Sequence, residues 1–568
     1  MDSVNSFKGY GKVDEIEEAA FKRKTRRRVI ILSVSVVLFI GLVIGVVVGA
    51  VVHSKKSGDV SGSSKTPSAA IKSVCSVTQY PESCFTSLHE SNSTDPEKIF
   101  QYSMTVAMDS LVKVSSFPEE YMNKTDNAAV KAALEVCNEV LDDAVASLND
   151  SISSMHGGGK MISVEGIEDL KTWLSTVITD QETCFDALDD ANATFVVEIR
   201  VLMKNSTEFA SNSLAIVSKL LGLLGDFKLP IHRRLLGDSE FPAWVGAAER
   251  RLLQAAVKPR PDLTVALDGS GDVRTLRDAV ARIPKKSAKR FVVYVKRGIY
   301  VGNVVLDKSL TNVMFYGDGK TATIFSGSKN VVDGTPTFST ATFAVVGKGF
   351  IARDIGFKNT AGPSKHQAVA MRSGADQSVF YQCAFDAFQD TLYTHSNRQF
   401  YRECDITGTV DFIFGNSAVV LQNCNILPRQ PMSNQFVTIT AQGKKDPNQN
   451  TGISIQRCTM SPLGTLTART YLGRPWKDYS TTVVMQTTIG GFLSPLGWAP
   501  WVTNVTPPRT IFYAEYQNTG PGSNTAGRVK WAGYHPSLTA TEAAKYNVQS
   551  FIQGPSWLPG KTVPFDST

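Results

Sequence analysis

The sequence predicts two folds in one chain, an all-α helical region followed by an all-β parallel β-helix. Between about 70 and 225, apolar residues recur at steps of three and four, a pattern typical of helices that pack against one another. From 257 onward, short β-rich runs are separated by Gly, Asn and Asp. Four of these runs end in cysteine at steps of 21, 20 and 34 residues. Such a nearly fixed period indicates a solenoid.

Two apolar stripes define the long helices of the first region. The first stripe is continuous, and the second is interrupted only at Gln181. Stripes of this kind predict antiparallel helices that each bury one face. The first consists of Val130, Leu134, Cys137, Leu141, Ala144 and Leu148, and the second of Ile167, Leu170, Leu174, Val177, Cys184 and Leu188.

Cysteines on these elements are expected to be paired. Cys137 and Cys184 lie on the two stripes, where a disulfide would join the helices. Cys75 and Cys84 are nine residues apart around Tyr80 and would close a small hairpin. Disulfides fit a secreted chain better than buried free thiols do.

The cysteine repeat of the second region sets the pitch of the solenoid. A coil of about 20 residues would stack equivalent positions about 4.8 Å apart. Cys383 and Cys404 are then vertical neighbours, which we expect to form a disulfide, while the pairing of Cys424 and Cys458 stays open. The four runs are Phe380–Cys383, Phe400–Cys404, Leu421–Cys424 and Ile455–Cys458.

The N-terminal segment predicts a secretory route. Residues 29–52 form an uncharged apolar run, long enough as a helix to exceed the ~30 Å core of a bilayer. A cleaved signal peptide usually has only about 7–15 apolar residues. Lys and Arg are concentrated at 22–28, before the run. The positive-inside rule therefore predicts a cytosolic tail at 1–28, a signal anchor at 29–52 and an extracytoplasmic linker at 53–69.

Sequons agree with this route. Five Asn-x-Ser/Thr sequons lie in the helical region and one in the β-rich region, and all six are expected glycosylation sites. They are Asn92, Asn123, Asn149, Asn192, Asn205 and Asn504.

Charge is divided between the two regions. The net charge of +7 hides an acidic part, residues 57–254, with 16 Lys+Arg against 28 Asp+Glu, a net of −12. Residues 255–568 have 33 Lys+Arg against 19 Asp+Glu, a net of +14. A basic surface suits a polyanionic partner. Outside the cytosol, that partner is expected to be an acidic polysaccharide and not nucleic acid.

A linker at 226–256 separates the helical region, 70–225, from the β-rich region, 257–568. It contains the same dibasic tetrapeptide twice, which suggests processing sites, although solvated linker charge is the simpler alternative. The two copies are Arg233-Arg234-Leu235-Leu236 and Arg250-Arg251-Leu252-Leu253.

A polar ladder in the β-rich region predicts the catalytic site. Gln367, Gln389 with Asp390, and Asp411 are separated by 22 and 21 residues, so they would stack on one face of successive coils. Asp residues can also cap turns in solenoids, but four such groups in register beside aromatic residues favour a site.

This set of groups suits ester hydrolysis. Of two neighbouring carboxyl groups, one holds a proton and the other stays ionised, which supplies an acid beside a nucleophile. Carboxamide N–H groups would stabilise the oxyanion that ester hydrolysis forms. Arg474, with Trp476 two residues later, would hold the ionised carboxylate and offer a ring to a sugar. The histidines have no metal-ligand spacing, and we expect neither a metal nor a cofactor.

These residues resemble a known family. Residues from about 257 to 560 resemble plant pectin methylesterases, which are right-handed parallel β-helices. Residues from about 70 to 225 are similar to the four-helix bundle of pectin methylesterase inhibitors. The family's Gly-x-Tyr-x-Glu motif here ends in Gly302. The matching stretches are Gly298–Tyr300, Gly362–Pro363, Lys365–Val369, Gln389–Tyr393, Asp411–Gly415 and Leu472–Trp476.

The resemblance implies roles for the ladder in hydrolysing the methyl esters of homogalacturonan. Asp411 would be the nucleophile and Asp390 the proton donor and base. Gln389 and Gln367 would stabilise the oxyanion. Arg474 would orient the nucleophile and, with the substrate-binding residues Thr337, Gln367 and Trp476, contact substrate.

It also implies how the chain is regulated and located. A subtilisin-like protease would cut at the dibasic motifs, converting a membrane-bound secretory precursor into an extracellular cell-wall enzyme. The helical region would inhibit its own esterase or act in folding and retention. A separate proteinaceous inhibitor is a further expected partner.

Two other functions fit parts of the pattern. A β-helix lyase or glycosidase would also act on pectin, but a lyase favours a calcium site and a glycosidase needs no paired glutamines. A tethered inhibitor or pectin-binding protein with an inactive esterase region would keep the fold without the activity. Methanol release without new reducing ends separates the esterase from both.

Overall fold

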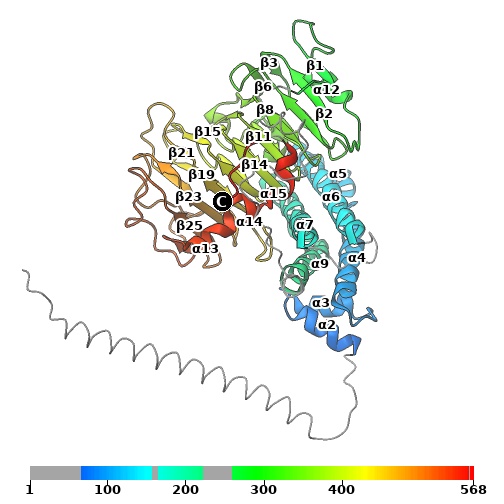
Figure 1. The fold of residues 1–568 in the computed structure, drawn as a ribbon. Helices are drawn as coiled ribbons and strands as arrows, with labels where there is room; N and C mark the ends of the chain where they lie inside the picture. The colour runs from blue at the N-terminus through cyan, green and yellow to red at the C-terminus, as the bar shows by residue number, and fades with distance from the viewer. Residues whose placement is uncertain (1–65, 156–163, 222–258, 562) are drawn as a thin grey trace, which may run out of the picture. The chain divides into compact units, whose positions relative to one another are not determined.

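The computed structural model describes residues 66–155, 164–221, 259–561 and 563–568, with helices in the first part and parallel sheets in the second (Figure 1). The predicted anchor at 29–52 and both dibasic motifs lie outside the described residues. A search for a membrane-spanning helix, limited to the described residues, finds none.

The helical region, residues 67–221, is built around long helices that lie side by side (Figure 1). Proline at the first position begins several of its helices, where the missing N–H group costs no hydrogen bond. The helices are α2 (Pro67–Cys75), α3 (Pro81–Leu88), α4 (Pro96–Val114), α5 (Phe117–Met122), α6 (Ala128–Met155), α7 (Val164–Asp190), α8 (Val196–Leu202), α9 (Lys204–Ala215) and η1 (Ile216–Leu221).

Both predicted apolar stripes are buried in the core of this region, on α6 and α7. The interruption at Gln181 has a structural reason. Its side chain is fully buried, and its Oε1 accepts hydrogen bonds from Ser206 Oγ at 3.1 Å and Thr207 Oγ1 at 2.8 Å. A buried amide satisfied in this way costs little, so the stripe continues past it.

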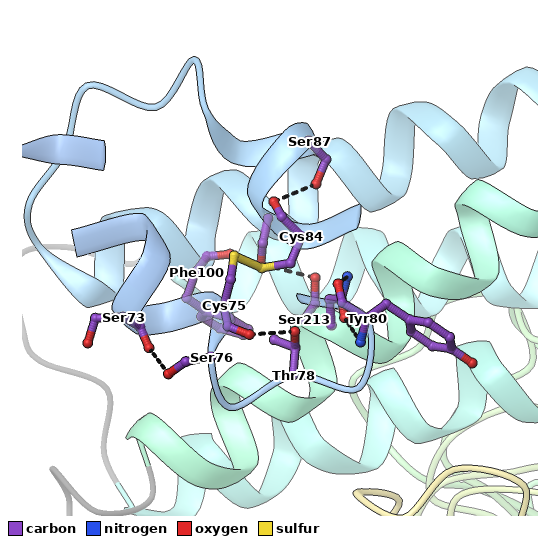
Figure 2. The surroundings of a disulfide bond; sticks show 11 residues. Ser73, Cys75, Ser76, Thr78, Tyr80, Cys84, Ser87, Phe100 and Ser213 are labelled. Atoms are coloured by element: carbon purple, nitrogen blue, oxygen red, sulfur yellow. Dashed lines mark hydrogen bonds between the residues drawn. A yellow bond between two sulfur atoms is a disulfide. The ribbon is translucent and has the colours of Figure 1, made fainter. Parts of the chain in front are cut away.

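The two disulfides predicted for the helical region are present. Cys137 and Cys184 join α6 to α7, and Cys75 and Cys84 join α2 to α3. Figure 2 shows the second of these, where Thr78 Oγ1 donates to the carbonyl of Cys75 at 2.8 Å. This bond satisfies a carbonyl at the C-terminus of α2, where helical partners are lacking.

The β-helix region, residues 263–561, consists of parallel sheets to which each full coil contributes one strand. The eleven-stranded sheet contains β1 (Leu263–Val265), β2 (Phe291–Val295), β5 (Val313–Tyr316), β8 (Ile351–Arg353), β11 (Ser378–Tyr381), β14 (Arg398–Arg402), β17 (Ala418–Gln422), β20 (Gly452–Gln456), β23 (Thr481–Met485), β25 (Phe512–Tyr516) and β26 (Tyr534–His535). The eight-stranded sheet contains β3 (Gly298–Val301), β6 (Thr323–Gly327), β9 (Gly356–Asn359), β12 (Ala384–Asp386), β15 (Asp405–Gly408), β18 (Asn425–Pro428), β21 (Thr459–Met460) and β24 (Thr488–Ile489). The seven-stranded sheet contains β4 (Val304–Leu306), β7 (Phe343–Val345), β10 (Met371–Ser373), β13 (Leu392–Thr394), β16 (Ile413–Gly415), β19 (Val437–Gln442) and β22 (Thr470–Gly473).

Short helices complete this region. Residues of α14 and α15 pack on the outer face of the eleven-stranded sheet, through Val548 and Trp557 against Val379 and Phe400. The helices and helical turns are α12 (Leu276–Ala281), η2 (Thr337–Thr340), η3 (Pro363–Lys365), α13 (Ala540–Ala543), η4 (Ala544–Tyr546), α14 (Val548–Phe551), α15 (Gly554–Trp557) and η5 (Leu558–Lys561).

The predicted repeat lengths match the register in which strands of successive coils pair. Phe380 pairs with Tyr401, Tyr401 with Leu421 and Leu421 with Ile455, at the predicted steps of 21, 20 and 34 residues. After each of these strands the chain turns a corner with one residue in the left-handed region, such as Asn423 at φ 55°. Because this bend recurs in each coil, the strands stay in register.

The disulfide predicted between Cys383 and Cys404 is wrong, because both are buried free thiols, as are Cys424 and Cys458. Register does make Cys383 and Cys404 neighbours, since the adjoining Ala384 pairs with Asp405. Side chains stacked on parallel strands are about 4.8 Å apart, however, whereas the Cβ atoms of a disulfide lie about 3.8 Å apart. The stack therefore packs as small apolar side chains in the core of the β-helix.

Gly302, where the family motif ends in Glu, is exposed, with a φ of 136°. A Cβ atom built there would have no atom within 4 Å. The position therefore has open space where a Cβ atom would lie. All six predicted glycosylation asparagines are exposed, as a sugar acceptor must be.

Candidate active site

A cavity of ≈ 180 Å³ lies on the seven-stranded sheet and collects the predicted site. All seven residues predicted for catalysis or substrate binding line it. They are Thr337, Gln367, Gln389, Asp390, Asp411, Arg474 and Trp476.

The coil register brings the polar ladder together. Gln367 and Gln389 form a parallel bridge between adjacent coils. The N–H of Asp390 donates to the carbonyl of Val410 at 3.0 Å, which places Asp390 beside the coil of Asp411. Both aspartates have left-handed backbones, with φ of 63° and 51°. Such strain persists only where the surrounding structure holds it, and it is concentrated at functional sites.

Asp411 is held in place by an arginine and a threonine. Arg474 donates to it through Nε to Oδ1 at 2.8 Å and through Nη2 to Oδ2 at 2.6 Å. Thr438 Oγ1 donates to Oδ1 at 2.6 Å. The bidentate guanidinium fixes the orientation of the Asp411 side chain. One carboxylate oxygen can then face the cavity as a nucleophile.

Asp390 is held as a carboxylic acid. Its side chain is 7% exposed. Burial raises the pKa of Asp390 well above its usual value, and the charge of Asp411 raises it further against the opposing effect of Arg474. Two adjacent carboxyl groups of unequal environment divide the roles of acid and nucleophile between them.

Aromatic rings form the walls of the cavity. Tyr393 and Phe414 stack at 4.2 Å between centroids, and Trp476 stacks on Trp501 at 6.4 Å. The guanidinium carbon of Arg474 lies 4.3 Å from the centroid of Trp501. Flat apolar rings around paired carboxyl groups suit a sugar polymer, whose ring faces are apolar.

Sequence reasoning missed part of this site. Trp501, Phe338 and Pro336 line the cavity, and Thr438 donates a hydrogen bond to Asp411. Trp501 follows the last predicted coil and belongs to no repeat, so no period could find it. Thr438 is 27 residues beyond Asp411, in the longer coil, and the step of about 20 does not reach it.

The helical region also supplies part of the lining, which the sequence did not predict. The same cavity as Asp390 and Asp411 is lined by four residues of α7, which are Thr183, Asp186, Ala187 and Asp190. A site for a drug-sized ligand usually has about 300–1,000 Å³. The remaining cavity is smaller than this, so α7 occupies space that a polysaccharide would need.

A polar face of α7 makes hydrogen bonds to the β-helix region. Asn416 Nδ2 donates to Thr179 Oγ1 at 2.8 Å, and Gln449 Nε2 donates to the carbonyl of Ser175 at 2.9 Å. Thr183 Oγ1 and His395 Nε2 are 2.9 Å apart. These side chains are buried, so their mutual hydrogen bonds replace those to water.

His395 takes part in this contact as a neutral ring. Burial lowers its pKa to about 3, with a smaller effect from Arg372. Burial also raises the pKa of Asp180, whose Oδ1 lies 3.9 Å from His395 Nε2. Two neutral groups in contact form no ion pair. Within the described ranges, no group of three or more His, Cys, Asp or Glu side chains is arranged to hold a metal ion.

The lysine and arginine ion pairs between the two regions share one arrangement of charge. Among the described residues, the acid is on the helical region and the base on the β-helix region in each of them, which matches the division of charge in the sequence. The pairs are Glu139–Arg372 at 2.9 Å, Asp143–Lys308 at 3.6 Å, Asp169–Arg398 at 2.7 Å, and Lys477 with Asp186 at 2.5 Å and Glu182 at 3.5 Å.

Comparison with known families accounts for both regions. The sequence profile described as Pectinesterase matches residues 262–555. The chain belongs to the pectinesterase family. A second profile, described as Plant invertase/pectin methylesterase inhibitor, matches residues 69–216. The protein is therefore a pectinesterase that hydrolyses the methyl esters of pectin, with an inhibitor-type helical region in the same chain.

Individual proteins are similar to this chain and support its place in the family. Pectinesterase 3 of Phaseolus vulgaris is 58% identical over 586 residues, and the alignment covers 100% of each chain. Pectinesterase 1 of Arabidopsis thaliana is 56% identical over 585 residues, with 99% of each covered. The solved structure of a pectin methylesterase from carrot is 52% identical with a TM-score of 0.54, over 55% of this chain and 99% of that chain.

Proposed function

We propose that Asp411 is the nucleophile and Asp390 the acid and base with which this pectinesterase hydrolyses the methyl esters of homogalacturonan. The observation that carries the proposal is the pairing of unlike carboxyl groups in one cavity. Arg474 bonds both oxygens of Asp411, whereas Asp390 is buried with a raised pKa.

The geometry suits a two-step reaction. The Asp411 carboxylate attacks the ester carbonyl carbon, and the amide N–H groups of Gln389 and Gln367 receive the oxyanion. As the bond to the methoxy oxygen breaks, Asp390 donates its proton to that oxygen and methanol leaves. The product of this step is an anhydride between Asp411 and galacturonate.

Water completes the reaction. The Asp390 carboxylate takes a proton from water as the water oxygen attacks the galacturonate carbonyl. The bond to Asp411 breaks, which frees the nucleophile as a carboxylate and leaves Asp390 protonated for the next cycle. Thr337 and Trp476, which line the cavity, would hold the neighbouring sugars.

The helical region closes this site in the uncut chain. Its helix α7 supplies four residues to the cavity lining and makes hydrogen bonds to His395 and Asn416 of the β-helix region. A subtilisin-like protease would release the site by cutting at one of the dibasic motifs, after which the basic β-helix region would stay on the anionic cell wall. Anchor, protease and a separate inhibitor protein are expectations from sequence.

Replacement of the catalytic residues tests the assignment. We expect Asp411→Asn and Asp390→Asn to lower methanol release from methylated pectin by about 10³-fold or more. Asp478→Asn is a matched control, because Asp478 is exposed and pairs only with Lys445 on the surface. The proteins are the full chain cut at a protease site introduced in place of residues 250–253.

Three outcomes would overturn the proposal. Unsaturated products would indicate a lyase, and full activity in either aspartate variant would remove that residue from the reaction. If the cut protein bound pectin but released no methanol, it would be a binding protein and not an enzyme. N-terminal sequencing of the natural protein locates the cut, expected after Leu236 or Leu253.

A further inference from the structure

Lys477 is a cation at the edge of the catalytic cavity. It directly follows Trp476, whose ring lines the cavity, and its Nζ lies 5.4 Å from that ring's centroid. The side chain is 16% exposed in the uncut chain. A lysine buried to this extent needs an anion, because an unpaired buried charge is costly.

The helical region supplies the anions. Lys477 Nζ lies 2.5 Å from Asp186 Oδ1 and 3.5 Å from Glu182 Oε2, both on α7. Within the described residues, every carboxylate in salt-bridge range of Nζ belongs to this helix. When α7 leaves, the ammonium group is therefore exposed beside the cavity without its partners.

Asp186 lies in the cavity at a place where a carboxylate of the substrate could lie. It lines the same cavity as Asp390, Asp411 and Trp476, so it presents a carboxylate to Lys477 beside the ring offered to a sugar. A de-esterified galacturonate unit combines these two features, since it bears a carboxylate on a sugar ring. Lys477 is better suited than Arg474 to bind this carboxylate, because Nε and Nη2 of Arg474 already donate to Asp411.

We propose that Lys477 of the released enzyme binds the free carboxylate of a de-esterified galacturonate unit, and that Asp186 occupies this subsite in the uncut chain. The inference rests on the proposed function of the cavity. It makes Lys477 a specificity-determining residue, since the enzyme would favour esters near a unit that is already hydrolysed. Each turnover would then create a ligand for the next.

Discrimination between two substrates tests the subsite. The full chain is cut at a site introduced in place of residues 250–253, and the β-helix region is separated from the helical region. Methanol release is measured on oligogalacturonides of one length, either fully methyl-esterified or with alternate free carboxylates. We expect Lys477→Gln to lower the ratio of kcat/KM, partly over fully esterified, by about tenfold, the usual effect of losing a hydrogen bond between charged groups.

Matched variants separate charge from structure. Lys477→Arg keeps a cation and should keep most of the ratio. Lys320→Gln removes a lysine that pairs with Asp405 on another sheet, and should leave the ratio at the parent value. Direct binding of the fully de-esterified oligomer, measured by calorimetry, should weaken in Lys477→Gln by a similar factor, independently of turnover.

The uncut chain tests whether Asp186 occupies the subsite of the galacturonate carboxylate. Asp186→Asn should raise methanol release from it, because Lys477 loses its nearer partner, and should add little in a Lys477→Gln background.

An unchanged substrate ratio and unchanged oligomer binding in Lys477→Gln would overturn the inference, and so would additive effects of the two substitutions in the uncut chain. If Lys477→Gln failed to fold, Lys477→Met and the Asp186→Asn result would decide in its place. Absence of methanol release from the parent would instead refute the proposed function, so the two failures are distinguishable.

Discussion

Helix α7 has two buried faces that are held in different ways. One face carries the apolar stripe with Leu174 and Cys184, which packs in the core of the helical region. The other carries Ser175, Thr179 and Thr183, which bond the β-helix region. The first face must stay buried for the helical region to fold, whereas the second can return to water when the regions separate.

This difference shows how one helix can belong to two assemblies. Exposing an apolar face costs free energy in proportion to its area, about 25 cal/mol per Å². A face of hydroxyl groups finds hydrogen bonds in water as well as in protein, so the net gain from each bond is only about 0.5–1.5 kcal/mol. The polar face therefore suits a contact that can be released.

The largest expected effect comes from the apolar face. Leu174→Ala should lower the free energy of unfolding of the helical region by about 2–5 kcal/mol, since Leu174 is fully buried. Denaturant unfolding of the uncut chain, followed by circular dichroism, measures this loss. A loss below about 1 kcal/mol, as at a surface site, would contradict the comparison.

An intermediate effect is expected from the polar face. Thr179→Val removes the acceptor for Asn416 Nδ2 and one acceptor for Gln449 Nε2, and an unsatisfied buried donor costs about 1–3 kcal/mol. We expect higher methanol release from the uncut chain, while the helical region unfolds at an unchanged denaturant concentration. Thr105→Val is the control, because Thr105 is exposed on α4 and bonds only within its helix. Equal activation by both variants would contradict the assignment.

The smallest effect is the pH dependence of the contact. Burial raises the pKa of Asp143 to about 6 despite the nearby Lys308, and Glu139 raises it further while Arg372 opposes. Because this pKa in the closed state is above the usual 3.8, closure takes up protons. The contribution of Asp143 to the contact is therefore fully present below about pH 4 and is lost as the pH rises through about 6, by at most ~1.4 kcal/mol per pH unit, whereas neutral His395 acts in the opposite sense below its ordinary pKa.

The ratio of methanol release by the uncut chain to that by the cut enzyme measures this dependence at each pH. Relative to the ratio of Asp143→Asn, the ratio of the parent should rise between about pH 4 and about pH 7. A ratio that falls with pH in the parent would show that other groups control the contact.

Periodicity predicted the parts of the fold and site that repeat. The helical stripes and the cysteine steps are patterns of side chains on a regular backbone, and both are confirmed. The same period brought Gln367, Gln389, Asp390 and Asp411 to one cavity. Trp501 lies outside any repeat, and Thr438 lies in the longer coil, so both were missed.

Distances finer than the repeat could not be predicted. Stacking correctly made Cys383 and Cys404 neighbours, yet the two thiols stay unpaired, since a disulfide needs shorter Cβ separation than parallel strands give. In the helical region, where the predicted disulfides cross between helices, both are present.

Residue type and spacing along the chain were enough to predict two folds of opposite charge and the coil period, and to propose the candidate catalytic residues. Only the tertiary structure decided that α7 turns its serine and threonine face to the β-helix region and brings Asp186 to Lys477. The sequence of a polar helix face does not show whether that face contacts water or protein. Its partner is fixed by the three-dimensional arrangement of Asn416, Gln449 and His395, which lie far along the chain.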